Sequence, residues 1–226
     1  LVPIFVDCEI DTLHIDVKKI EEKITKKTKA LLIPNLIGNL PNWKKIRQIA
    51  NKYNLLVLED SADTLGATVN NKPSGIYSDI SITSFYGSHI INCAGNGGMV
   101  CFNNKKHYLK AKLLRSWGRS SSLYDEKSEK IENRFNIKLD GIQYDKKFVF
   151  SEQGHNLEPS EIGAAFGLIQ LGKLKKNIAI REKNFEKISK FLETYSNYFI
   201  LPKQLPNSKT GWLAYPITLK DNVPFT

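Results

Sequence analysis

The residues most able to do chemistry stand at the ends of two apolar segments. Glu59 and Asp60 directly follow the apolar run 55–58, and Ser84 lies near the end of segment 80–85, with His89 five positions further on. In open α/β sheets, ligands bind beyond the carboxyl ends of the strands, so an acid, a hydroxyl and an imidazole could meet at one sheet edge. An imidazole there could move a proton near neutral pH. Spacing alone leaves two interpretations open, a catalytic site, or a helix-capping Asp beside a structural His.

The segments around these residues alternate between strand and helix patterns. Buried strands are predicted at 30–34 and 55–58, and amphipathic helices at 16–24 and 42–53, the first with Asp16 as its N-cap. This alternation predicts a mostly parallel sheet with helices on both faces, a three-layer αβα sandwich. The remaining expected elements are strands at 1–7, 80–85, 99–102, 147–150 and 212–219, and helices at 106–116, 159–174 and 178–195.

Composition narrows the class of protein. The 226 residues carry 33 Lys and Arg against 23 Asp and Glu, a formal charge of +10. Lys is spread over several predicted helices and no nucleic-acid-reading motif accompanies the charge, so we expect solvated helix faces and no nucleic-acid partner. No apolar run is long enough for a bilayer and the first residues lack a basic n-region, so neither membrane nor signal peptide is expected. The three cysteines lack paired or metal-like spacing, which favours reduced core thiols in a cytoplasmic protein and no metal site.

Four segments carry a resemblance to a known family. Residues 59–67 (EDSADTLGA), 79–86 (DISITSFY), 95–100 (GNGGMV) and 154–158 (GHNLE) resemble, in order, segments of the DegT/DnrJ/EryC1/StrS sugar aminotransferase family. The resemblance spans nearly the whole chain. It implies the α/β fold of fold-type I enzymes, which depend on pyridoxal phosphate (PLP). It also implies a large cofactor-binding domain over 1–150 that lacks its N-terminal part. Linking helices and the start of a smaller, truncated C-terminal domain would occupy 151–226.

The resemblance also implies roles for particular residues. Asp60 would pair with the protonated pyridine nitrogen and keep the ring an electron sink. Ser84 would bind the cofactor phosphate through its hydroxyl, and Asn156 would reach a cofactor phosphate across the interface of a homodimer with shared active sites. Asp63 stands where aminotransferases of the family have Gln or His, as a further cofactor-binding position. Glu158 replaces the basic residue of the family's G-x-N-x-R segment.

The sharpest departure from the family pattern is His89. The family's S-F-x-x-x-K segment has a lysine there, which holds the cofactor covalently, and this chain reads Ser-Phe-Tyr-Gly-Ser-His over 84–89. A histidine resembles the dehydratase subset, which uses pyridoxamine phosphate (PMP) to remove the 3-hydroxyl of nucleotide-linked 4-keto-6-deoxyhexoses. His89 would be the catalytic proton carrier. Glutamate would restore the amine, and the product would feed deoxysugar and O-antigen lipopolysaccharide synthesis.

One dehydratase branch adds an iron–sulfur cluster, and this chain resembles the branch without it. Registered on His89, the positions of the four cysteine ligands are occupied by residues that are not thiols, so no cluster is expected. Two further alternatives stay open, a PLP-dependent nucleotide-sugar aminotransferase and a non-catalytic homologue. The four positions registered to the cysteine ligands of the iron–sulfur cluster hold Ala62, Ser120, Ser122 and Lys130.

Overall fold

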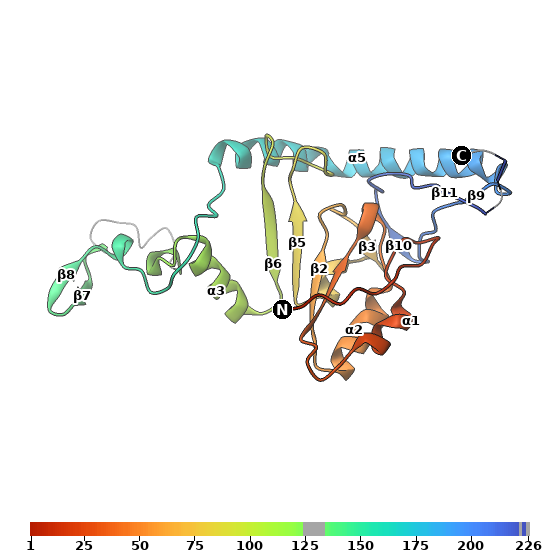
Figure 1. Cartoon of the computed structure of the whole chain (residues 1–226). Helices are drawn as coiled ribbons and strands as arrows, with labels where there is room; N and C mark the ends of the chain where they lie inside the picture. The colour runs from red at the N-terminus through yellow and green to blue at the C-terminus, as the bar shows by residue number, and fades with distance from the viewer. Residues whose placement is uncertain (124–133, 222, 225–226) are drawn as a thin grey trace. The chain divides into compact units, whose positions relative to one another are not determined.

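A computed structural model describes residues 1–123, 134–221 and 223–224. The largest sheet among these residues has four strands. Its strand order is β1-β2-β5-β6, and β2 runs parallel to both β1 and β5 (Figure 1). The mostly parallel sheet expected from the alternating pattern is therefore confirmed. The strands are β1 (Ala30–Pro34), β2 (Leu56–Asp60), β5 (Ile80–Ser84) and β6 (Gly98–Phe102).

One face of this sheet is covered by helices. Two lie here, α1 (Val17–Ile20), continued by a short 3-10 turn, and α2 (Trp43–Lys52). Asp16 caps α1 by accepting the backbone N–H of Lys18, as expected. The apolar residues of α2 recur at helical spacing and so form one face, which packs on the strands. The core cluster contains Ile20, Ile33, Leu40, Trp43, Ile46, Ile49, Ala50, Leu55, Val57 and Ala67.

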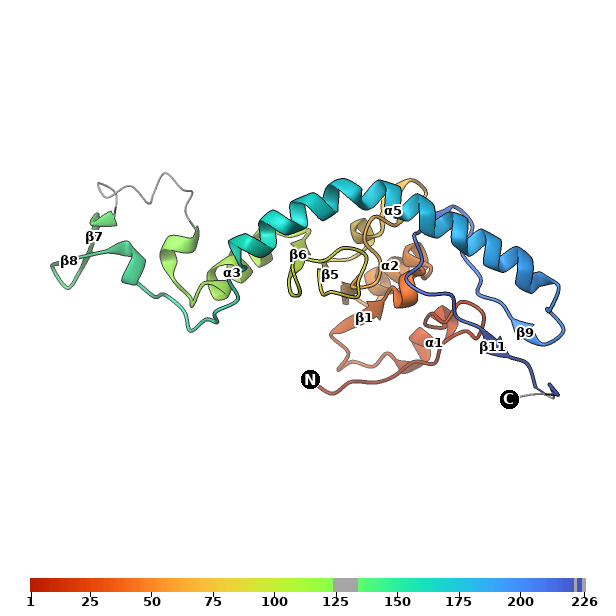
Figure 2. The same ribbon diagram turned by 90° about the horizontal axis from the view of Figure 1, so that it is seen from above.

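A single long helix, α5 (Glu161–Glu193), replaces the two helices expected at 159–174 and 178–195 (Figure 2). The segment that joins them, 175–177, holds neither Pro nor Gly, so nothing in it breaks the helix. The helix passes beyond the carboxyl end of β5 (Figure 1). A Cβ placed on Gly66, which has φ +83°, would lie 2.7 Å from the Ile178 side chain, so the turn after β2 approaches α5 closely.

Small elements complete this part of the chain. The strands expected at 1–7 and 212–219 are wrong for most of their length, because these segments run mainly without ladder partners. Trp212 is instead held by stacking on Phe185, with ring centroids 4.4 Å apart. The short elements are η2 (Leu36–Gly38), β3 (Thr68–Val69), β4 (Lys72–Pro73), η3 (Ser74–Tyr77), β9 (Phe199–Ile200), β10 (Ser208–Lys209) and β11 (Thr218–Leu219).

The chain divides into two compact units, residues 1–101 with 161–226, and residues 102–160. The second unit contains α3 (Lys105–Arg115), which confirms the helix expected at 106–116. A 3-10 turn, η6 (Lys146–Phe148), occupies the first half of the strand expected at 147–150, and Phe150 forms only an isolated bridge with Arg119. The unit also holds η4 (Ser120–Leu123) and a hairpin of β7 (Ile137–Leu139) and β8 (Ile142–Tyr144). The domain limits predicted from the resemblance, 1–150 and 151–226, stay a prediction.

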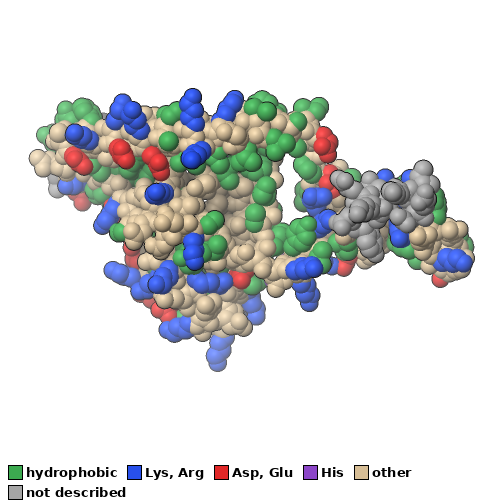
Figure 3. Space-filling model, turned by 180° about the vertical axis from the view of Figure 1, so that it is seen from behind, with side chains coloured by type: hydrophobic (Ala, Val, Ile, Leu, Met, Phe, Trp, Pro, Cys, Tyr) green, Lys and Arg blue, Asp and Glu red, His purple; other side chains and the backbone are tan. Residues whose placement is uncertain are grey.

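Two surface features bear on the composition. Lys and Arg side chains are spread over several elements on the face seen in Figure 3, with Asp and Glu among them, as solvated helices would place them. The described cysteines are all unpaired, but Cys8 and Cys101 are exposed, so the expectation of core thiols is wrong for these two. Among the helices described, none combines the length and apolarity needed to cross a bilayer.

Candidate functional site

Asp60 and Ser84 share one face of the sheet at the ends of neighbouring strands. Asp60 pairs with Ile82 in the parallel register, and Ser84 lies two residues beyond Ile82, so both point to the same side. The Asp60 Oδ1 accepts the backbone N–H of Ala62 at 3.0 Å. Within the described part of the chain, Oδ2 has no hydrogen-bond donor, so one oxygen of this half-buried carboxylate stays available to a ligand.

Ser84 opens the loop that carries His89. Its Oγ accepts the backbone N–H of Tyr86 at 3.2 Å, which leaves the hydroxyl proton free to be donated. Two backbone bonds close the loop, from Phe85 N–H to the Gly97 carbonyl at 2.8 Å and from Cys93 N–H to the Phe85 carbonyl at 3.0 Å. The glycine-rich stretch that the sequence placed after His89 therefore returns to the base of the loop, and its position relative to β5 is defined.

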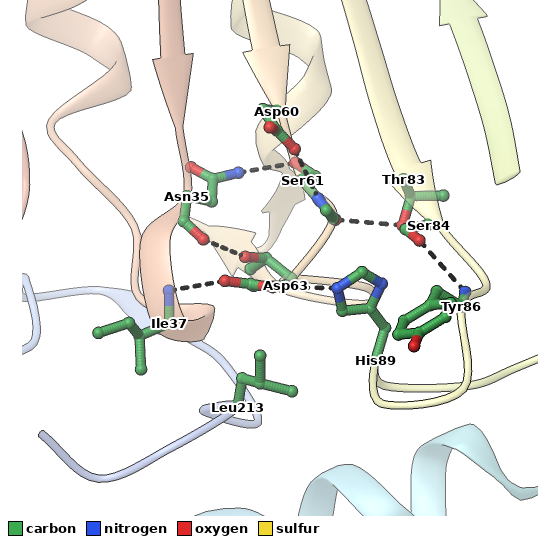
Figure 4. A network of polar contacts seen from close by, with 12 residues as sticks. Asn35, Ile37, Asp60, Ser61, Asp63, Thr83, Ser84, Tyr86, His89 and Leu213 are labelled. Atoms are coloured by element: carbon green, nitrogen blue, oxygen red, sulfur yellow. Dashed lines mark hydrogen bonds and ion pairs between the residues drawn. The ribbon is translucent and has the colours of Figure 1, made fainter.

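His89 faces Asp63 at the carboxyl ends of the strands. Its Nε2 lies 3.6 Å from the Asp63 Oδ1, and both side chains are about one-fifth exposed, 21% and 23%. Figure 4 shows Asp60, Asp63, Ser84 and His89 gathered at the ends of neighbouring strands. Of the five residues predicted for the site, the structure thus brings four together within one unit. Because a carboxylate stands beside it, the imidazole is not a residue buried among apolar side chains.

Asn156 and Glu158 lie in the second unit. Asn156 forms an isolated antiparallel bridge with Ser116, and its side chain is exposed. The Glu158 carboxylate accepts from the Ser116 hydroxyl and lies 3.2 Å from the Arg115 guanidinium. An acidic residue at 158 therefore has a cationic partner in its own unit. The contact of Asn156 with a cofactor phosphate stays a prediction.

Glu59 is the polar residue whose contacts sequence reasoning missed. Its side chain is 2% exposed, and its Oε1 accepts from Asn35 Nδ2 at 2.9 Å, from Ser61 Oγ at 2.6 Å and from Ser74 Oγ at 2.5 Å. Its Oε2 accepts from Ser78 Oγ at 3.0 Å. The carboxylate thereby joins the end of β1, the turn after β2 and η3. The available signal was alternation, since Glu59 must point to the face opposite Asp60.

The donor set fits a phosphorylated pyridine. Asp60 offers a carboxylate oxygen to a protonated ring nitrogen, and Ser84 offers a hydroxyl to a phosphate. The His89 Nδ1 is covered and has no hydrogen-bond partner within the described residues, so it too is uncommitted. The charges and donors of these groups therefore suit PLP or PMP, and their contacts with a cofactor stay a prediction.

The positions registered to iron–sulfur ligands hold no thiol. Ala62 lies in the turn after β2, and Ser120 and Ser122 lie in η4. Lys130 falls outside the described residues. No group of three or more His, Cys, Asp or Glu side chains is arranged to hold a metal ion in the part of the chain that the structure describes.

Comparison with known proteins gives a family match over almost the whole chain. The model of the DegT/DnrJ/EryC1/StrS aminotransferase family matches residues 1–224. The lipopolysaccharide biosynthesis protein RfbH of Salmonella typhimurium is 34% identical over 223 residues, which are 98% of this chain and 51% of that protein. The GDP-4-keto-6-deoxy-D-mannose 3-dehydratase of Escherichia coli O55:H7 is 32% identical over 217 residues, 96% of this chain and 53% of that enzyme.

Solved structures share the fold. The E. coli GDP-4-keto-6-deoxy-D-mannose-3-dehydratase with bound hydrated PLP superposes with a TM-score of 0.82 at 27% identity, covering 98% of this chain and 54% of that one. An aminotransferase from Psychrobacter cryohalolentis gives 0.84 at 25% identity, covering 98% and 55%. These matches confirm the expected fold-type I α/β architecture. The chain spans about half the length of these relatives.

Proposed function

The chain belongs to the DegT/DnrJ/EryC1/StrS aminotransferase family, and on that premise we propose that its full-length protein is a sugar 3-dehydratase. It would use PMP to remove the 3-hydroxyl of a nucleotide-linked 4-keto-6-deoxyhexose. The observation that carries the proposal is His89, an imidazole paired with a carboxylate at the strand end where the family's pattern has lysine. The 3-dehydratase relatives support the same assignment.

His89 separates two jobs that a single lysine otherwise combines. A lysine amine can hold PLP covalently and also carry protons, whereas an imidazole forms no stable Schiff base and can only move the proton. A histidine at this position therefore favours a cofactor held by non-covalent contacts alone. Asp60 and Ser84 supply two such contacts, one toward the ring nitrogen and one toward the phosphate.

Each residue has a defined task in the proposed reaction. Asp60 holds a proton on the pyridine nitrogen, Ser84 orients the phosphate and His89 takes a proton next to the reacting carbon. When bound, the cofactor supplies an amine for the 4-keto group and an electron sink for the charge left by the removed proton. The loop closed by Phe85, Cys93 and Gly97 keeps the imidazole in place during proton transfer.

The overall chemistry needs glutamate as the reductant. C3 of the hexose is reduced from CHOH to CH2 as its hydroxyl leaves as water. The α-carbon of glutamate is oxidised to the keto carbon of 2-oxoglutarate and its nitrogen is released as ammonia by hydrolysis, which consumes one water, so that no net water is formed. The product is a 3-deoxy-4-keto sugar. We also propose a homodimer in which Asn156 of one copy contacts the cofactor phosphate held by the other.

The decisive experiment supplies all reactants to the full-length protein. Incubation with PMP, glutamate and a GDP- or dTDP-linked 4-keto-6-deoxyhexose should yield a 3-deoxy sugar with one equivalent each of ammonia and 2-oxoglutarate. A 4-amino sugar without ammonia would contradict the proposal and identify an aminotransferase. The structural similarity to the Psychrobacter aminotransferase is the observation that favours this second candidate. Ligand binding with no turnover would indicate a non-catalytic homologue.

A second experiment tests the position of His89. In the His89→Lys variant the new amine should attach PLP covalently, detected by mass spectrometry after borohydride reduction, whereas the parent protein should retain none. Ser88→Lys is the matched control, because it places the same amine one residue away. Equal labelling of both variants would remove the support for His89 as the residue at the cofactor.

A further inference from the structure

Asp63 stands at a position expected to contact the cofactor, yet both of its oxygens have protein neighbours. Oδ2 accepts the backbone N–H of Ile37 at 3.0 Å, and Oδ1 faces the His89 Nε2 at 3.6 Å. The carboxylate is therefore placed between the turn after β1 and the loop after β5 (Figure 4). Its orientation is set before any ligand binds.

The donor that holds Asp63 is itself in an unusual conformation. Ile37 has φ +57° and ψ +21°, a left-handed backbone that a β-branched residue rarely adopts. Two bonds fix it, its N–H to Asp63 and its carbonyl accepting the Leu213 N–H at 2.9 Å. Strain of this kind persists only where surrounding contacts over-determine the backbone, and it concentrates at functional sites. The Asp63 carboxylate thus rests on a rigid donor.

The imidazole is constrained on its other sides as well. The His89 backbone N–H donates to the Tyr86 carbonyl at 3.1 Å, and the Tyr86 ring lies edge-on, with centroids 5.9 Å apart. The Nδ1 atom is covered and lacks a partner among the described residues. Asp63 is the one described carboxylate within ion-pair distance of the ring.

We infer that Asp63 is a positioning residue for His89, and that it selects the Nε2–H form of the neutral imidazole. The Nε2–Oδ1 separation of 3.6 Å is an ion-pair contact, and the negative charge of an ionised carboxylate, which can only accept protons from a donor, favours the tautomer whose N–H faces it. The lone pair then lies on Nδ1, so in the proposed reaction the proton would be taken up at that atom once a bound cofactor displaces what covers it. The inference rests on the proposed function only for this catalytic consequence, because the tautomer is a property of the free protein.

The test reads the tautomer directly. The full-length protein with 15N-labelled histidine is measured by two-bond 1H–15N correlation spectra, which link the ring nitrogens to the ring carbon-bound protons, above the pH at which imidazoles titrate. The His89 signals are assigned with a His89→Gln variant, and His14, His107 and His155 serve as internal references. We expect the neutral Nε2–H pattern for His89. A dominant Nδ1–H pattern in the parent protein overturns the inference.

Asp63→Asn gives the sharper outcome. The Asn carbonyl must keep accepting the Ile37 N–H, so its NH2 group turns toward Nε2 and donates to it. The tautomer should then invert to Nδ1–H. Asp63→Leu removes both contacts and should leave a mixture of the two forms. Asp11→Asn, which only loses a surface pair with Lys203, is the control and should change neither. An unchanged tautomer in both Asp63 variants overturns the inference.

Kinetics then separate positioning from binding. If the full-length protein is a dehydratase, Asp63→Asn should lower kcat by about 100-fold or more, the usual range for a misplaced proton carrier, with the KM for the sugar nearly unchanged. A raised KM or lost PMP affinity with kcat preserved would indicate that Asp63 contacts the cofactor directly, and would overturn the positioning role. Failure of dehydration altogether would leave the tautomer result standing, so the two proposals fail separately.

Discussion

The two faces of the parallel sheet carry similar residues and have different environments. Ile33 and Val57 point to the face covered by α2 and are almost completely buried. Leu32 of β1, next to Ile33, and Ile82 of β5 point to the other face and are 69% and 41% exposed. Hydrophobicity alone does not distinguish the faces, because alternation fixes only which residues share a side. Exposed apolar residues on one side of a sheet indicate a surface that another element or chain can cover.

The same contrast appears in the two adjacent acids of β2. Glu59 points to the covered face and accepts four hydrogen bonds, while Asp60 points to the open face and accepts one in the described structure. Buried polar groups are tolerated when they are paired, which Glu59 satisfies within the protein. Asp60 keeps an oxygen for a ligand. The face on which each carboxylate lies thus separates structural from chemical use.

The largest effect should come from the covered face. Trp43 is fully buried, and its Nε1 donates to the Asn35 Oδ1 at 2.8 Å. Trp43→Ala should lower the free energy of unfolding by about 3–5 kcal/mol, because a large cavity and an unpaired amide oxygen remain. Urea denaturation of the parent and variant measures this difference. A loss below about 1 kcal/mol would mean that the helix–sheet contact contributes little.

His14 tests what happens when a buried polar group lacks partners. Neither of its ring nitrogens makes a hydrogen bond of good geometry within the described chain, and burial lowers the pKa of His14 from 6.5 to about 4 against a smaller raising effect of the Asn39 backbone. In the unfolded chain the His14 imidazole therefore binds a proton below about pH 6.5, whereas in the folded protein it stays neutral down to about pH 4. Stability should fall by about 3 kcal/mol as pH decreases through this window.

The control for His14 is a matched pair of variants. His14→Leu should abolish the part of the pH dependence due to this residue, whereas His155→Leu, at an exposed position, should keep it. Denaturation curves at pH 7 and pH 4 decide between them. The same slope in all three proteins would show that His14 does not set it.

Glu59→Gln should cost less than the loss of the tryptophan, because the shape of the side chain is kept. Gln keeps one accepting oxygen, so its NH2 group loses the Ser78 hydroxyl if it takes the place of Oε2, or the three donors on Oε1 if it takes that place. We expect about 1–3 kcal/mol of destabilisation, measured by thermal and urea unfolding. Unchanged stability would indicate that the serine hydroxyls rotate to new partners without cost.

Asp60→Asn should leave stability within about 0.5 kcal/mol, since Asn can still accept from the Ala62 N–H. Affinity for PLP or PMP should instead weaken by roughly 10- to 100-fold, the worth of one charge-assisted hydrogen bond of about 1.5–3 kcal/mol. Fluorescence titration of the full-length protein measures it. Unchanged affinity for the cofactor together with a large loss of stability would instead assign the structural role to Asp60 and contradict its role as a ligand contact.

The smallest effect belongs to the open face. Leu32→Ala should change the stability of the 226-residue chain by less than about 0.5 kcal/mol, because the side chain is already exposed. Ile33→Ala, one residue along on the covered face, is the matched comparison and should cost about 2–5 kcal/mol. Equal losses would contradict the difference between the faces. A larger loss for Leu32→Ala in a longer form of the protein would indicate that added residues cover it.

Much of the site could be predicted from local pattern, and the rest could not. The apolar runs before Asp60 and Ser84 predicted strands that end at these residues, and the parallel arrangement put them at one edge. The pairing of Asp63 with His89 was not predictable, because the two belong to different turns. The pattern was also misinterpreted at α5, because segment 175–177 holds neither Pro nor Gly and gave no reason to end the helix.

The sequence by itself determined the order of the elements, the face that each strand residue shares with its neighbours, and the family. These follow from short-range preferences and from motifs read along the chain. Tertiary structure alone decided which face is covered, that Glu59 is buried among four donors, and that the Asp63 carboxylate faces the His89 imidazole. The physical reason is that burial and hydrogen bonding depend on which distant segments meet, and each such meeting is set by the packing of the whole unit.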